Sequence, residues 1–262
     1  MNLGLQDKAV IVLASSAGLG KATALEFARE GANVMLFSRR EKECLRAKEE
    51  IESATGREPA CTVGDAMKAD DLRAVVRNTV EAFGRVDALV NNTGGPPAGT
   101  FDQFDDAAWQ AAFELTLLSY VRVIREVLPH MRKAGGGRIV NFTSSSVRSA
   151  LDNLILSNAF RMGVVGLTKT LAHELGRDNI LINVLGPGRF ATDRVKSLDA
   201  ARAGKSGLSI EQVQQEAMKA IPLGRYGKPE EFARTAVFLC SGANTFITGQ
   251  TLLVDGGMVR AY

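Results

Sequence analysis

Short apolar runs alternate with longer helical segments along this chain, and that alternation limits it to a few fold classes. Residues 9–14 (AVIVLA) form a continuous apolar run, which is typical of a strand buried on both faces. Residues 21–31 (KATALEFAREG) then show helical spacing and end on Gly31, a helix stop. Residues 33–38 (NVMLFS) return to an apolar run, so strand and helix follow one another from the start.

The alternation continues to the end of the chain. Further strands are expected at 58–65, 86–95, 137–146, 179–188 and 250–257, and helices at 69–83, 106–132, 153–176 and 230–241. Strands joined by helices of this length form a parallel sheet through right-handed crossovers. We therefore predict an α/β fold with one domain over 1–262, a single Rossmann-type doubly wound parallel sheet flanked by helices on both faces.

One long region, about 189–228, interrupts the alternation and is expected to be irregular. It is polar at first and then amphipathic, with Ile210, Val213, Ala217 and Ile221 on the apolar side. Because it follows the carboxyl end of a strand, we predict a lid-like insertion there. A surface excursion without a gating role is the alternative.

Composition argues against several classes of protein. The 32 basic and 29 acidic residues nearly balance, and no basic stripe of a nucleic-acid-binding protein is present. No apolar run is long enough to span a membrane, and Asp7 and Lys8 interrupt any signal peptide, so a cytoplasmic protein is expected. The three cysteines show no metal-ligand spacing, which predicts neither a metal site nor a disulfide.

A glycine-containing turn, LASSAGLGKA (13–22), joins the first strand to the first helix. Gly18 and Gly20 allow close approach of the backbone to a ligand, and the following helix N-terminus offers free N–H groups to a pyrophosphate. The turn therefore indicates dinucleotide binding.

The end of the second strand reads SRR (38–40). An NAD site places a carboxylate here for the ribose 2′-hydroxyl, whereas this chain has Ser38 followed by Arg39 and Arg40. Arg39 is able to clamp a 2′-phosphate through charge-assisted hydrogen bonds, which favours NADP(H) over NAD(H). The alternative is the solvated start of a charged helix.

Several motifs occur together in a fixed order: SSAGLG (15–20), Asp65, NNTG (91–94), Ser144 after GRIVNFT, GPGRFAT (186–192), PLGRYGKPEE and TGQTLLVDGG. With these motifs the chain resembles the classical short-chain dehydrogenase/reductases, and among them the β-ketoacyl carrier-protein reductases. The glycine turn, the SRR segment and the resemblance together predict these cofactor-binding residues: Ser15, Ser16, Gly18, Leu19, Gly20, Ser38, Arg39, Arg40, Asp65, Ala66, Asn91, Gly94, Pro187, Gly188 and Thr192.

The resemblance also predicts the catalytic positions, where this chain departs from the family pattern. Ser144 matches the family serine, whereas Thr116 falls on the family asparagine. Ser157 and Arg161 fall on the tyrosine and lysine, four residues apart and thus on one face of a helix. Ala14 falls on the first glycine of the cofactor turn.

These replacements change the chemistry that the site can perform. An aliphatic hydroxyl such as Ser157 is a poor general acid, and Arg161 holds its proton too firmly to release it. Ser144, Ser157 and Arg161 are instead expected to form a donor cluster that stabilises an oxyanion. Tyr120 is a possible replacement for the missing acid, with core packing as the alternative.

The sequence thus predicts an NADP(H)-dependent oxidoreductase that acts on a small carbonyl or activated substrate. The alternative is a non-catalytic nucleotide-binding or scaffold homologue. The resemblance implies a homo-oligomer, a tetramer or dimer, in which Gly163, Gly166 and Ala172 allow close approach of a second copy.

Overall fold

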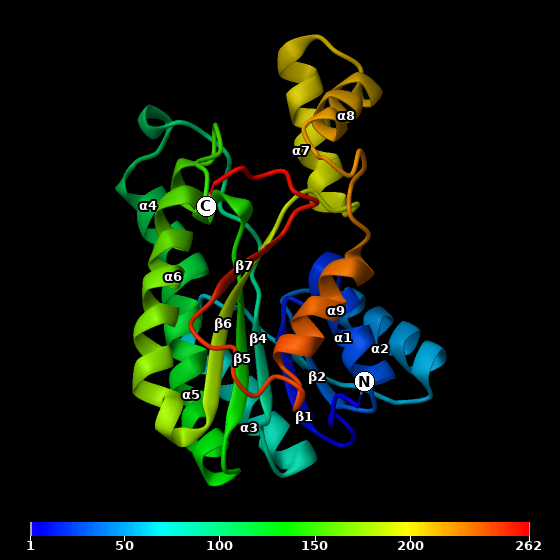
Figure 1. Cartoon of the computed structure of the whole chain (residues 1–262), viewed down its shortest axis with the longest axis vertical. Helices are drawn as coiled ribbons and strands as arrows, with labels where there is room; N and C mark the ends of the chain where they lie inside the picture. The colour runs from blue at the N-terminus through cyan, green and yellow to red at the C-terminus, as the bar shows by residue number, and fades with distance from the viewer. Residues whose placement is uncertain (1, 262) are drawn as a thin grey trace.

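Seven parallel strands run through the centre of the protein (Figure 1). The structure, a computed structural model, describes residues 2–261. Within these residues the strand order is β3-β2-β1-β4-β5-β6-β7. The strands are β1 Ala9–Leu13, β2 Asn33–Ser38, β3 Ala60–Val63, β4 Ala88–Asn91, β5 Gly137–Phe142, β6 Ile180–Pro187 and β7 Thr251–Val254.

Helices cover both faces of the sheet. On one face lie α1 (Gly18–Arg29), α2 (Glu41–Thr55) and α9 (Pro229–Leu239), which share one apolar cluster with the strands. On the other lie α3 (Ala69–Phe83), α5 (Ser119–Lys133) and α6 (Ile155–Leu175), which share a second cluster. Helix α4 (Asp106–Phe113) continues into α5 through a π-helical turn, Glu114–Leu118. The predicted doubly wound sandwich is confirmed.

The first strand shows why an apolar run predicts burial on both faces. Every residue of β1 is buried, and successive side chains of a strand point to opposite faces. Val10 and Val12 accordingly belong to the cluster beneath α1 and α9, whereas Ile11 and Leu13 belong to the cluster beneath α3 and α5.

The strand order places a crevice at the carboxyl ends of β1 and β4. The chain leaves β1 toward β2 and β3 on one side, then crosses back to β4 on the other. In open α/β sheets, ligands bind at such a switch point. The loops after β1, β2, β4 and β5 therefore converge on one edge.

The expectation of an irregular segment over about 189–228 was wrong. The structure forms two helices there, α7 (Asp193–Ser206) and α8 (Ile210–Lys219), which rise above the carboxyl edge in Figure 1. Ser209 caps α8, and Ala203 and Val213 are among the residues buried in the hairpin. Packing between two short helices is not apparent from a segment's own polarity.

A buried polar cluster anchors the helical hairpin to the sheet. The carboxylate of Asp199 on α7 accepts hydrogen bonds from Arg189 at 2.6 Å and from the Tyr226 hydroxyl at 2.9 Å. Because Asp199 is completely buried, loss of either donor would leave its charge poorly compensated.

The expectation that the cysteines form no disulfide was also wrong. Cys44 on α2 is bonded to Cys61 on β3, 17 residues further along the chain. The spacing of cysteines along the chain does not show which of them tertiary packing brings together. Cys240 is buried and free. Among residues 2–261, no helix has the length and apolar character that crossing a bilayer requires.

Candidate active site

A hollow of about 240 Å³ opens between the loops that follow β1, β2, β3 and β4. Its lining combines small side chains and backbone with hydroxyl, amide and charged groups. The residues are Ala14, Ser16, Ala17, Phe37, Ser38, Arg39, Arg40, Gly64, Asp65, Ala66, Asn92, Thr93, Gly94 and Leu115. Seven of the residues predicted to bind cofactor thus border one cavity: Ser16, Ser38, Arg39, Arg40, Asp65, Ala66 and Gly94.

The end of β2 supplies the charge of this hollow. The Ser38 hydroxyl donates to Ser16 Oγ at 2.8 Å and accepts from the Arg40 backbone N–H at 3.2 Å. Arg39 lies 3.9 Å from the carboxylate of Asp65, and its side chain is 66% exposed. An exposed guanidinium held this loosely is free to turn toward a bound anion.

The turn after β1 brings backbone to the edge of the hollow. Gly18 has φ +56°, and a Cβ at Gly20 would lie 2.8 Å from Asn92 Nδ2 and closer still to the Ala14 carbonyl. No side chain caps the start of α1, so its first N–H groups are left for a ligand. Leu19 is the second residue of α1, directly within this first turn.

Two predicted residues have other partners. Ser15 is completely buried, and its hydroxyl accepts from the Phe37 backbone N–H at 3.0 Å. Asn91 is also buried, and its amide donates to Asn141 Oδ1 at 2.7 Å. Asn92 borders the hollow instead. The NNTG motif contains both asparagines, and the sequence alone does not show which of the two side chains faces the hollow.

The loops after β6 face the same crevice. Pro187 ends β6, and a Cβ at Gly188 would lie 2.6 Å from Asp255 Cα, so the backbone passes closely there. Thr192 caps α7, and its Cγ2 lies 3.8 Å from the place where a Gly18 Cβ would stand. The start of α7 therefore adjoins the glycine turn.

Ser157 and Arg161 lie on one face of α6, as predicted, and both are 6% exposed. Arg161 Nε donates to Ser157 Oγ at 3.2 Å, and Arg161 Nη1 donates to the Phe142 carbonyl at 3.1 Å. Phe142 ends β5, two residues before Ser144. These contacts bring the α6 pair to the same end of β5 as Ser144.

The hydrogen bonds determine how the two serine hydroxyls can act. Ser157 accepts from Arg161, and Ser144 accepts from the Ser146 backbone N–H at 3.1 Å. A guanidinium or amide N–H can only donate, so each serine oxygen is an acceptor in these contacts. Each O–H proton is then free to donate to a ligand oxygen.

Thr116 and Tyr120 both lie within the fold. Thr116 is in the π-helical turn, is completely buried, and donates to the Ala112 carbonyl at 2.6 Å. Tyr120 is also completely buried, and its hydroxyl donates to the Phe142 carbonyl at 2.8 Å. Burial raises the pKa of Tyr120. The possible substitute acid is thus a core residue that shares the carbonyl that anchors Arg161.

Several buried hydroxyls near this edge lack a partner within the described chain. Thr93 Oγ1, Thr143 Oγ1 and Ser146 Oγ form no hydrogen bond in residues 2–261. They follow the neighbouring strands β4 and β5, at the carboxyl edge of the sheet. Buried polar groups are normally satisfied, so three unsatisfied hydroxyls at one edge favour a site that a ligand or water completes.

Comparison with known proteins agrees with this geometry. Residues 13–259 match a family described as enoyl-(acyl carrier protein) reductase. The chain is 34% identical over 257 residues to the 3-oxoacyl-[acyl-carrier-protein] reductase of Thermotoga maritima, covering 97% of this chain and 99% of that protein. It is 33% identical to the same enzyme of Chlamydia muridarum over 258 residues, covering 98% of this chain and 100% of that protein.

Solved structures of oxidoreductases share this fold. The L-sorbose reductase of Gluconobacter frateurii, complexed with NADPH and L-sorbose, superposes with a TM-score of 0.95 at 31% identity and full coverage of both chains. A 7α-hydroxysteroid dehydrogenase complexed with NADH superposes with a TM-score of 0.90 at 31% identity, covering 98% of this chain and 96% of that chain. By fold, by motif order and by similarity along its length, the chain belongs to the classical short-chain dehydrogenase/reductase family.

Proposed function

We propose that this protein is an NADP(H)-dependent oxidoreductase that acts on a small carbonyl or activated substrate. Its site would use Ser144, Ser157 and Arg161 in place of a serine, tyrosine and lysine. The observation that carries the proposal is the pair of serine hydroxyls, each held as an acceptor and free to donate.

The residues present fit the dinucleotide. The uncapped start of α1 suits a pyrophosphate, and Gly20 in its first turn packs on the Ala14 carbonyl too closely to carry a side chain. Asp65 and Ala66 would hold the adenine edge at the far side of the hollow. Arg39 would supply the 2′-phosphate contact, since no carboxylate ends β2. Relatives bind NADPH or NADH, and Arg39 is the feature of this chain that favours NADP(H).

The bound cofactor would supply or accept the hydride of the reaction. Ser144 and Ser157 would donate hydrogen bonds to the substrate oxygen and stabilise its negative charge as it develops. The buried guanidinium of Arg161 would add a fixed positive charge next to that oxygen. A water or the substrate itself would provide the proton, because neither serine nor arginine releases one readily.

A substrate that needs little acid catalysis suits this arrangement. Losing a positioned general acid typically costs about 10²–10⁴ in rate. An activated ketone or a conjugated enone already stabilises its enolate or alkoxide, so hydrogen-bond donors suffice. Among the relatives named above, the 3-oxoacyl-[acyl-carrier-protein] reductases and the L-sorbose reductase are named for carbonyl compounds.

The direct test measures NADPH oxidation with a panel of 3-oxoacyl thioesters, ketoses, diketones and enones. We expect turnover with at least one member, and a fall of about 10²–10³ in kcat for Ser144→Ala and for Ser157→Ala. Ser53→Ala on the exposed surface of α2 is the matched control and should retain wild-type turnover. NADPH binding without turnover of any compound would instead favour the nucleotide-binding scaffold.

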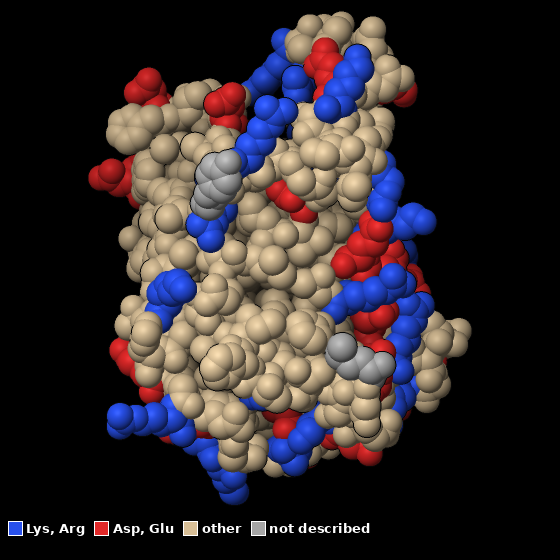
Figure 2. Space-filling model, viewed as in Figure 1, with Lys and Arg blue, Asp and Glu red and all other residues tan. Residues whose placement is uncertain are grey.

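We also propose that the protein self-associates. Figure 2 shows a broad face without charged side chains over β6 and β7. β7 is an edge strand, and Leu252 on it and Phe246 before it are both exposed. On α6, a Cβ at Gly163 would lie 2.8 Å from Leu117 of the same chain, so Gly163 serves internal packing, whereas Gly166 faces open space. A monomer in light scattering would contradict the proposal.

A further inference from the structure

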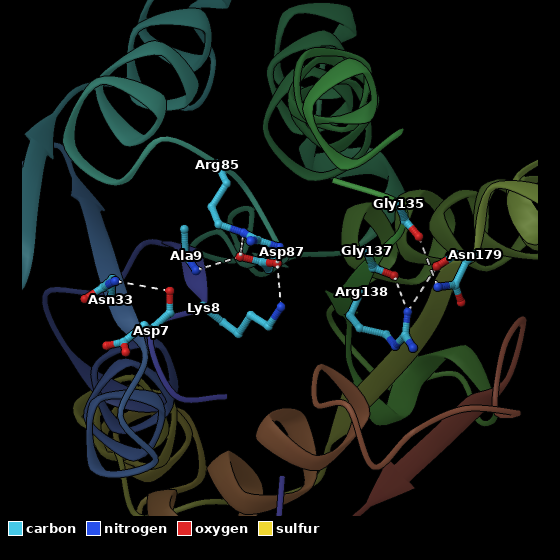
Figure 3. Close-up of polar contacts among 10 residues, drawn as sticks. All are labelled: Asp7, Lys8, Ala9, Asn33, Arg85, Asp87, Gly135, Gly137, Arg138 and Asn179. Carbon is cyan, nitrogen blue, oxygen red and sulfur yellow. Dashed lines mark hydrogen bonds and ion pairs between the residues drawn. The ribbon is translucent and has the colours of Figure 1, made fainter. Parts of the chain in front are cut away.

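A second hollow, of about 180 Å³, lies at the opposite edge of the sheet, where β1, β4 and β5 begin. Figure 3 shows the groups that surround it: Lys8, Arg85 and Asp87 on one side, and Gly135, Gly137, Arg138 and Asn179 on the other. None of these residues borders the cofactor crevice. The hollow is therefore separate from the site described above.

Cations outnumber anions around this hollow. Lys8, Arg85 and Arg138 line it, and Asp87 is the one carboxylate among its lining residues in the described chain. That carboxylate is already engaged: Oδ2 accepts from the Ala9 backbone N–H at 2.9 Å, and both oxygens accept from Arg85 at 2.6 and 2.7 Å. Three cations and one carboxylate leave a net charge of about +2.

Lys8 remains available to a ligand. Its Nζ lies 3.4 Å from Asp87 Oδ1, and its side chain is 39% exposed. An ion pair at this distance, shared with the much closer Arg85, holds a lysine weakly. A small rotation of the lysine side chain would bring its ammonium to an anion in the hollow.

Arg138 contributes a partly buried cation whose partners are all neutral. Its Nε donates to the Asn244 carbonyl at 3.1 Å, and its Nη1 donates to the carbonyls of Gly137 at 2.9 Å and Asn179 at 3.1 Å. No carboxylate forms an ion pair with it within residues 2–261, and its Nη2 has no hydrogen bond there. Burial lowers the pKa of Arg138, which reflects the cost of an uncompensated cation.

The glycine run before β5 keeps the hollow open. Gly136 has φ +145°, and a Cβ there would lie 2.6 Å from Asn179 Nδ2. Gly135 has φ +81° and nothing within 4 Å of where its Cβ would stand. The part of the wall formed by Gly135 and Gly136 is therefore backbone without side chains.

We propose that this hollow binds a small oxyanion of the phosphate class, held by Lys8 Nζ and the free edge of the Arg138 guanidinium. A tetrahedral oxyanion has enough acceptor oxygens to be held by a cation on each side of the hollow, and it would neutralise the excess charge. The hollow has room for one such group with water. This inference does not depend on the proposed oxidoreductase activity.

Inorganic phosphate is the probe, measured by isothermal titration calorimetry in chloride buffer at low ionic strength. Because Arg39 would also attract phosphate, the titrations use the Arg39→Ala protein as background. We expect saturable binding of one phosphate, weakened about 5–10-fold by Lys8→Met and abolished by Lys8→Glu. Lys42→Met, on exposed α2, is the matched control and should change nothing.

Three results would overturn the proposal: no saturable binding in the Arg39→Ala background, unchanged affinity in both Lys8 variants, or an equal loss in Lys42→Met. Thermal unfolding of each variant without phosphate shows whether it folds. Lys8→Met is the decisive variant because the Lys8 side chain is only partly buried and bonds no backbone carbonyl within residues 2–261, whereas Arg138 links three segments.

Discussion

The half of the crevice proposed to bind adenosine and the half around Ser157 differ in how they hold their charged side chains. Around the adenosine hollow, Arg39 is exposed and loosely paired with Asp65 at 3.9 Å. Around Ser157, the Arg161 guanidinium is buried and donates to two fixed acceptors. Arg39 is therefore free to form an ion pair with a ligand, whereas Arg161 orients the Ser157 hydroxyl.

This difference teaches that the two halves should respond differently to mutation. A loosely held exposed charge contributes mainly to ligand affinity, and its removal leaves the fold intact. A buried donor that fixes its neighbours contributes to the transition state and to local order. Substitutions in each half separate these two contributions.

Arg161→Met should have the largest effect, because it removes the donor that holds Ser157 as an acceptor. We expect kcat to fall about 10²–10³-fold, or about 3–4 kcal/mol in the barrier, with the Kd for NADPH changed only a few-fold. Steady-state kinetics and fluorescence titration measure the two quantities. Arg161→Lys, which keeps the charge, should retain part of the rate. An equal loss of binding and rate would contradict the separation of the halves.

Removing the disulfide between Cys44 and Cys61 should have the second largest effect, on the free energy of unfolding. Closing a loop of 17 residues with a disulfide stabilises a fold by about 3 kcal/mol in the chain-entropy estimate. Cys44→Ala should therefore lower the free energy of unfolding by about 2–3 kcal/mol in denaturant titrations. A thiol reductant should destabilise the wild type by a similar amount and leave Cys44→Ala unchanged. A wild type indifferent to the reductant would refute the bond.

Arg39→Ala tests the exposed half directly. Losing a charge-assisted contact with the 2′-phosphate should weaken NADPH binding about 30-fold, or about 2 kcal/mol, and leave NADH binding unchanged. Fluorescence titration with both cofactors measures this. Arg46→Ala, an exposed arginine on α2 paired with Glu50, serves as the control and should affect neither. If NADPH and NADH binding weakened equally, Arg39 would not contact the 2′-phosphate.

Ala14→Gly should have the smallest effect and the opposite sign. Ala14 has φ +47°, a left-handed conformation that costs a residue with a Cβ about 1–2 kcal/mol. Glycine removes that cost but adds unfolded-state entropy, so we expect a net gain of at most about 1 kcal/mol in unfolding free energy. Ala74→Gly inside α3 should instead destabilise by about 1 kcal/mol. A loss of stability in Ala14→Gly would contradict the strain.

Much of the fold was predictable because buried strands and amphipathic helices each leave a pattern of apolar residues along the chain. The run NVMLFS coincides with β2, and residues 69–83 coincide with α3. The segment 193–219 was not, because α7 and α8 are polar helices that bury their apolar residues mainly against each other. A pattern read along one segment contains no information about the partner that buries it.

The sequence predicted where the candidate site residues lie on their helices and strands, but not how their side chains are oriented. Ser157 and Arg161 were expected on one helix face and are found there. That Arg161 is anchored to the Phe142 carbonyl, and that Tyr120 shares this acceptor, follows from α5 and α6 packing against β5. Ser15 and Asn91 are directed into the fold, although their motif neighbours Ser16 and Asn92 border the hollow.

Periodicity and motif order are local properties of the chain, and they were enough to predict the parallel sheet, the glycine turn and the residue types available at the crevice. Other contacts depend on tertiary packing: the Cys44–Cys61 bond, the hydrogen bonds to Ser144 and Ser157, and the grouping of cations at the amino edge of the sheet. Such contacts join residues that are distant in the chain, and their geometry is set by how whole helices pack on the sheet.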